Sequence, residues 1–132
     1  MAKTLETRLE IRSWDEKPYR ELADGRKFNR ADVVLAGDPL ADCTFEALMF
    51  YRPDGTSTYV TFMYITGALD GRSGSFVLQG EGTYDGTTAR SRYTVVEGSG
   101  TGELAGLRGT AESASTHEDY PHMPLTLNYD IG

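Results

Sequence analysis

The stretch that decides the fold is residues 43–68, which read CTFEALMFY (43–51), RPDGT (52–56) and STYVTFMYITGA (57–68). The two outer segments are rich in aromatic and β-branched residues, which favour β-strands. The Pro53-Asp54-Gly55 sequence between them has the chemistry of a tight turn. Together the three segments predict a β-hairpin.

The same alternation of strands and turns continues on both sides of this hairpin. Residues 69–74 and 85–86 contain the glycines and aspartates that mark turns. Residues 5–12 alternate apolar or small side chains with charged ones, as in a strand with one solvent-exposed face. We expect eight strands, over residues 5–12, 27–35, 43–51, 57–68, 75–84, 87–97, 108–114 and 123–131.

Eight strands with short connections favour an all-β fold, an eight-stranded antiparallel up-and-down β-barrel of lipocalin-like size. At 132 residues the chain is expected to form a single domain, residues 1–132. Pairing of the first strand with the last would remove two exposed sheet edges. A two-sheet sandwich is the alternative. Residues 13–22 are expected to be a connector with at most a turn or two of helix, because Pro18 restricts the residue before it.

Composition excludes several classes of function. The formal net charge of −7 and the scattered arginines disfavour nucleic-acid binding. No stretch of about eighteen apolar residues predicts a membrane-spanning helix. The single cysteine, Cys43, cannot form an internal disulfide, and residues 1–5 do not resemble a secretory signal. We therefore expect a cytoplasmic protein with neither a nucleic-acid nor a membrane partner.

Side-chain alternation separates an inner from an outer face of each strand. Gly80 and Gly82 mark the inner face of the strand at 75–84, because small residues suit a curved wall. The same reasoning places odd-numbered residues of 43–51, 59–65 and 89–95 inside. It leaves Leu48, Phe50, Val60, Phe62 and Tyr64 outside, which is too apolar a surface for a monomer. We expect a homo-oligomer, dimer or trimer; an inverted alternation, with these residues in the core, is the alternative.

Three stretches resemble a bacterial family of proteins of unknown function. They are SWDE (13–16) followed by Pro18-Tyr19, GALDGRSGSFVLQ (67–79) and GSGTGELAGLRG (98–109). The resemblance covers nearly the whole chain. It implies an eight-stranded barrel similar to plant allene oxide cyclase, a cofactor-free enzyme that steers a reactive lipid epoxide into ring closure. A shared fold does not establish a shared reaction.

The chain departs from this family pattern at two positions. Met63 stands where relatives commonly have a glutamate, and Gly80 stands where they commonly have a histidine. Both changes remove polar groups from positions predicted to be inside. We expect them to make room for a bulky apolar ligand and to weaken the case for inherited acid–base chemistry.

Aromatic and thioether side chains on the inner face suggest a ligand pocket, because they offer a large contact area. An interior filled by the same side chains is the alternative. The candidate substrate-binding residues are Trp14, Phe45, Met49, Tyr59, Met63, Phe76, Leu78, Ser91 and Tyr129.

Candidate catalytic residues are fewer. Tyr51 and Tyr93, with Tyr129, carry hydroxyls that can polarise a carbonyl. Glu46 lies among apolar neighbours and is a candidate acid or base; an exposed carboxylate on the outer wall is the alternative.

Other motifs predict no chemistry. His117 and His122 lie in a proline-containing loop whose spacing is a weak metal signature, so no metal site is predicted. Cys43 has no neighbouring histidine and is expected to be an inert buried thiol. The GSGTG run at 98–102 lacks the lysine and the helix of a phosphate-binding loop.

The leading hypothesis is therefore a cofactor-free cyclase or isomerase of secondary metabolism. It would act on an apolar small molecule, such as a polyketide- or lipid-derived intermediate, by enforced conformation and tyrosine polarisation. A non-catalytic carrier or sensor barrel is the second hypothesis, and a structural protein with a filled interior is the third.

Overall fold

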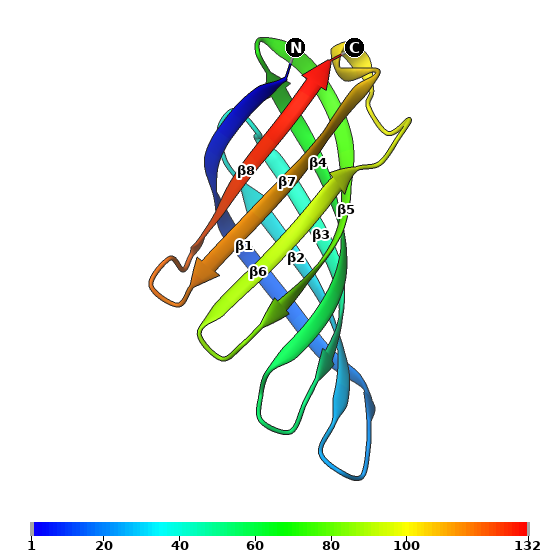
Figure 1. The fold of residues 1–132 in the computed structure, drawn as a ribbon, viewed down its shortest axis with the longest axis vertical. Helices are drawn as coiled ribbons and strands as arrows, with labels where there is room; N and C mark the ends of the chain where they lie inside the picture. Colours follow the sequence, from blue (N-terminus) through cyan, green and yellow to red (C-terminus); the bar gives the residue numbers. More distant parts are fainter. Residues whose placement is uncertain (1, 132) are drawn as a thin grey trace.

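The computed structural model describes residues 2–131 and contains one antiparallel sheet of eight strands (Figure 1). A single 3₁₀ turn, η1 (Gly102–Leu104), interrupts the connection before the seventh strand. The strands are β1 (Lys3–Glu21), β2 (Lys27–Ala36), β3 (Asp42–Tyr51), β4 (Ser57–Leu69), β5 (Arg72–Tyr84), β6 (Thr88–Val95), β7 (Leu107–Thr116) and β8 (His122–Ile131).

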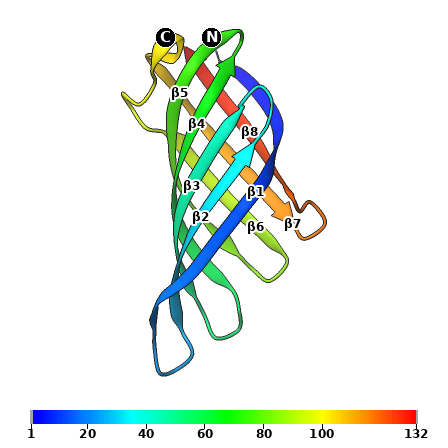
Figure 2. The same ribbon diagram turned by 180° about the vertical axis from the view of Figure 1, so that it is seen from behind.

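Each strand pairs with the next in the chain, and β1 also pairs with β8, so the sheet closes into a ring. The predicted all-β, up-and-down order and the pairing of the terminal strands are confirmed. Figures 1 and 2 show the strands strongly tilted, with both termini at one end of the ring and four hairpin loops stepping downward at the other. Closure satisfies the backbone groups that two free edges would leave unpaired.

The expectation of a connector at residues 13–22 is wrong, because β1 continues as a strand to Glu21. The irregularity between Ile11 and Ser13 shifts the alternation by one residue, so Trp14 and Glu16 face inward opposite Val33 and Ala31. Because the inward positions change from odd to even numbers at this bulge, the sequence shows no single period of two across residues 5–21. Pro18 sits at a second irregularity, where a strand tolerates a residue that lacks an N–H.

The lower part of β1 pairs only with β2. Its ladder with β8 ends at Glu10 opposite His122, followed by one bond from the Ile11 N–H to the Pro121 carbonyl. Beyond this point one edge of β1 faces solvent. Proline and charged side chains along residues 12–21 discourage another strand from adding there.

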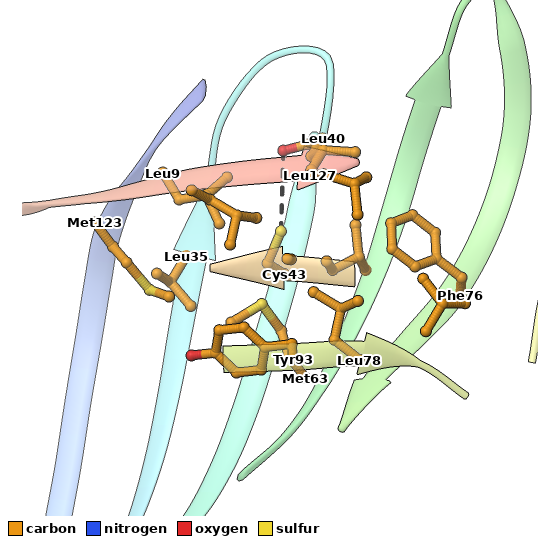
Figure 3. Packing of buried hydrophobic residues seen from close by; sticks show 14 of the residues in the cluster. Leu9, Leu35, Leu40, Cys43, Met63, Phe76, Leu78, Tyr93, Met123 and Leu127 are labelled. Atoms are coloured by element: carbon orange, nitrogen blue, oxygen red, sulfur yellow. Dashed lines mark hydrogen bonds between the residues drawn. The ribbon is translucent and has the colours of Figure 1, made fainter. Parts of the chain in front are cut away.

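The predicted inner faces are confirmed on β3 to β6. Cys43, Ala47, Met63 and Ile65 are buried, whereas Leu48 on the outer face is 48% exposed. Toward the end that holds the termini, the ring is filled by apolar side chains from every strand (Figure 3). Leu40 from the β2–β3 loop and Leu104 from η1 close that end, and both have no exposed surface.

Gly80 corrects one sequence-based expectation. A Cβ at this position would overlap the carbonyl oxygen of Arg92 and would lie 2.7 Å from Cδ1 of Tyr93. The space beside Gly80 is therefore occupied by β6, and the glycine does not enlarge a ligand site. Its role is to let two neighbouring strands approach where the wall bends.

Gly80→Ala is expected to lower the free energy of unfolding by about 1–3 kcal/mol, because the added methyl must push β5 away from β6. Glu81→Ala, on the exposed neighbouring residue, serves as the control and should change it by no more than about 0.5 kcal/mol. Urea denaturation followed by circular dichroism measures both. Equal effects of the two substitutions would contradict the close approach at Gly80.

Candidate functional site

The half of the ring away from the termini holds a cavity of about 380 Å³. It lies between the lower parts of all eight strands and opens among the β5–β6 and β7–β8 loops, which contribute Thr87, His117 and Tyr120. The opposite half is filled by the core side chains of Figure 3, of which Tyr93 and Met123 also line the cavity where the two halves meet. The ring is thus filled at one end and hollow at the other.

Seven of the predicted site residues line this cavity. They come from β1, β3, β4 and β6, all from inward positions of their strands. They are Trp14, Phe45, Met49, Tyr51, Tyr59, Ser91 and Tyr93. The rings of Trp14 and Phe45 meet edge to face with centroids 5.8 Å apart, which fixes the apolar wall of the cavity.

Four other predicted substrate-binding residues, Met63, Phe76, Leu78 and Tyr129, belong to the packed half and are not among the residues that line the cavity. The prediction of their inward direction is confirmed, since each is at most 6% exposed. Alternation along a strand gives the side of the wall but not the height along the ring. Residues near the closed end therefore become core.

Glu46 lies on the outer face and does not line the cavity. Its Oε2 accepts a hydrogen bond from Nη2 of Arg30 at 3.1 Å, and its side chain is 68% exposed. The structure therefore agrees with the alternative interpretation of Glu46, an exposed carboxylate on the outer wall, and not with a buried acid or base. An open groove of about 1120 Å³ crosses this outer face between Arg30 on β2 and Asn128 on β8. Leu48, Val60 and Phe62 line this groove and remain exposed to solvent.

Glu16 of β1 is a carboxylate beside the cavity that the sequence pattern did not predict. Its Oε1 accepts from Nε1 of Trp14 at 3.0 Å. Its Oε2 accepts from Nδ2 of Asn29 at 2.7 Å and from the Tyr51 hydroxyl at 2.8 Å. Three donors thus converge on one carboxylate beside the cavity. The signal was hidden because Glu16 faces inward only after the bulge that precedes Ser13.

Burial raises the pKa of Tyr51 strongly, and its hydrogen bond and charge interaction with Glu16 raise it further. Tyr51 therefore stays protonated and donates to Glu16. Across the cavity the Tyr59 hydroxyl and Ser91 Oγ are 2.8 Å apart, and burial raises the pKa of Tyr59 as well.

Within residues 2–131, two deeply buried side-chain atoms near the cavity have no hydrogen-bond partner. They are Oδ1 of Asn29, a residue 5% exposed, and Oγ of Ser57, a residue 1% exposed. Because Nδ2 of Asn29 donates to Glu16, its Oδ1 is left as a free acceptor. Buried polar groups are almost always paired, and of these two residues Ser57 lines the cavity, so its Oγ can bond to a molecule held there.

The remaining reactive side chains do not form a second site. Burial raises the pKa of Cys43 to about 12, and its Sγ lies 4.0 Å from the Leu40 carbonyl within the core (Figure 3). The Nε2 of His117 lies 2.8 Å from the Tyr84 hydroxyl at the mouth of the cavity. Within residues 2–131 no three His, Cys, Asp or Glu side chains gather in a way that could hold a metal ion. The same residues include no helix able to cross a membrane.

Comparison with known proteins places this geometry in a family. Residues 6–129 match the family described as protein of unknown function (DUF3224). The chain belongs to the DUF3224 family. A crystal structure of a DUF3224 protein with unknown function from Shewanella oneidensis MR-1 is similar over 100% of this chain and 99% of that one, with 24% identity and a TM-score of 0.78. No curated protein matches the chain. The DUF3224 structure supports the closed fold and assigns no activity to the cavity.

Buried tyrosines give this DUF3224 chain a specific pH dependence. Burial raises the pKa of Tyr93 from 10.0 to about 12. The unfolded chain loses this proton first, so the free energy of unfolding should fall as pH rises from about 10 to about 12. Tyr93→Phe should make that decline shallower, and Tyr120→Phe, at an exposed position, should leave it unchanged. Urea titrations across this pH range measure it; identical slopes for Tyr93→Phe and wild type would contradict the assignment.

Proposed function

We propose that this protein binds a mainly apolar small molecule inside the open half of the ring. The observation that carries the proposal is the contrast between the two halves, one packed and one hollow over about 380 Å³. A cavity of this size falls near the lower end of the roughly 300–1,000 Å³ typical of small-molecule sites. Its aromatic and thioether walls suit such a ligand. A filled ring with a purely structural role would need no such space.

A cofactor-free cyclase or isomerase, acting on a polyketide- or lipid-derived intermediate, is the second candidate. The observation in its favour is the Glu16–Tyr51 pair, joined at 2.8 Å beside the cavity. A carboxylate is a suitable general base, and a shaped cavity can enforce the conformation that ring closure needs. The likeness to the allene oxide cyclase barrel is an argument from fold alone and supports this candidate only as an analogy.

A bulky residue in the cavity tests binding directly. The neutral fluorescent probe N-phenyl-1-naphthylamine should bind the wild-type protein with enhanced emission. Ala89→Trp fills the cavity wall and should weaken binding at least about tenfold, because the indole competes for the same space. Arg90→Trp, on the adjacent outward position of β6, is the matched control and should bind as the wild type does.

Binding that survives Ala89→Trp, in a variant whose circular dichroism is unchanged, would contradict the proposed site. The two candidate functions separate by mass spectrometry of a ligand taken up from a cell extract. A carrier returns the molecule unchanged, whereas an enzyme releases a product. In the enzyme case Glu16→Gln should retain binding and lose conversion.

The outer apolar patch, defined as Leu48, Val60, Phe62 and Tyr64 on β3 and β4, supports self-association. These side chains are 48–58% exposed. The charged neighbours around the patch carry both signs. The positive ones are Arg30, Arg52 and Arg92, and the negative ones are Asp32, Glu46 and Glu81. Two copies can therefore meet face to face with opposite charges at their rims. We propose that a second copy of this chain covers the patch.

Phe62→Glu is expected to convert a wild-type dimer or trimer into a monomer, because it places a charge in the centre of the patch. Size-exclusion chromatography with light scattering measures the mass. Thr83→Glu, on the exposed outer face of β5, is the control and should leave the oligomer intact. A monomeric wild-type protein at micromolar concentration would rule out self-association through this patch.

A further inference from the structure

The cavity has two walls of different chemistry. The wall from β1 to β3 presents Ile11, Ala31, Phe45 and Met49, together with the ring of Trp14. The polar tip of Trp14 is already engaged, since its Nε1 donates to Glu16. This wall therefore offers a ligand mostly carbon and sulfur, with flat aromatic surface and a thioether that packs well against rings.

The wall from β4 to β7 is lined with hydroxyls. Ser57 and Tyr59 come from β4, Ser91 and Tyr93 from β6, and Ser113 from β7. Ser91 and Ser113 are opposite each other in the β6–β7 register, so their side chains lie next to each other on the inner face. Hydroxyls both donate and accept hydrogen bonds, and Ser57 Oγ has no partner within the described protein.

None of the residues that line this cavity in the described structure is a lysine, arginine, aspartate or glutamate. The titratable groups other than tyrosine are His117 and His122, which lie at the mouth. Glu16 approaches from behind Tyr51, but its oxygens already accept from Trp14, Asn29 and Tyr51. A charged ligand group would lose its hydration without gaining an ionic partner, which is costly. The cavity therefore favours a neutral occupant.

We infer that the ligand is a neutral ring compound with a hydroxyl or carbonyl oxygen along one edge. Its flat carbon face lies against the β1–β3 wall, and its oxygen bonds the hydroxyls of the β4–β7 wall. This inference rests on the proposed small-molecule binding and adds the chemical class and the orientation of the ligand. The pair Tyr59–Ser91 and the free Ser57 hydroxyl are the groups that select for the oxygen.

Three probes of one shape test the class: naphthalene, 2-naphthol and 2-naphthoate, measured by fluorescence or calorimetry at neutral pH. One added hydrogen bond makes a net difference of about 2- to 10-fold in affinity. 2-Naphthol should therefore bind about 2- to 10-fold more tightly than naphthalene. Because the carboxylate of 2-naphthoate is charged, this probe should bind more weakly than either.

A variant carrying both Ser57→Ala and Tyr59→Phe removes two wall hydroxyls. It should bring the 2-naphthol to naphthalene affinity ratio close to one and leave naphthalene binding nearly unchanged. Thr58→Ala removes a hydroxyl from the outward position between them and should keep the wild-type ratio.

Two results on the wild-type protein would overturn the inferred ligand class: equal affinities for 2-naphthol and naphthalene, or tightest binding of 2-naphthoate among the three. In either case the cavity would still be shown to bind a probe. Failure of all three probes to bind would overturn the proposed function along with it. If the double variant does not fold, the order of the three probes on the wild-type protein still decides the question.

Discussion

The pairing of β1 with β8 is the constraint on which the rest of the structure depends. The ladder runs from Lys3 opposite Tyr129 to Glu10 opposite His122, and there it stops. Above this point the wall is continuous, and apolar side chains from all strands fill the interior of the ring. Below it β1 continues to Glu21 with β2 alone, so the wall is open on one side. A single register therefore sets both where the core ends and where the cavity begins.

The polar groups of the cavity follow from the same geometry. After the bulge before Ser13, β1 turns Trp14 and Glu16 toward the interior, and Glu16 collects hydrogen bonds from β1, β2 and β3. This network ties the lower part of β1 to the sheet on its inner face, where β8 no longer pairs with it. The opposite wall keeps its hydroxyls available to the interior. The Glu16 network thus lies on β1 to β3, and the row of hydroxyls lies on β4 to β7.

The sequence was sufficient for the fold because strand alternation repeats over most of the chain. Turn residues such as Asp54-Gly55 and Asp85-Gly86 delimit the strands, and the inner face of β3 to β6 follows from period two. Seven of the predicted site residues line the cavity for the same reason.

What the sequence left out depends on three-dimensional detail. Alternation does not report height along the ring, so Met63, Phe76 and Leu78 were placed in the site although they belong to the core. The bulge in β1 reversed the alternation and hid Glu16. The sequence predicts that Gly80 makes room for a ligand, but the backbone of β6 fills that room. Only the close approach of β5 and β6 in three dimensions reveals this.

The most direct measurement of the central claim is a crystal structure of the protein grown with 2-naphthol. The account predicts electron density for the naphthalene rings between Trp14 and Tyr59, with the ligand oxygen toward Ser57 and Ser91. Density only on the outer face of the sheet, or side chains that fill the lower half of the ring, would contradict it.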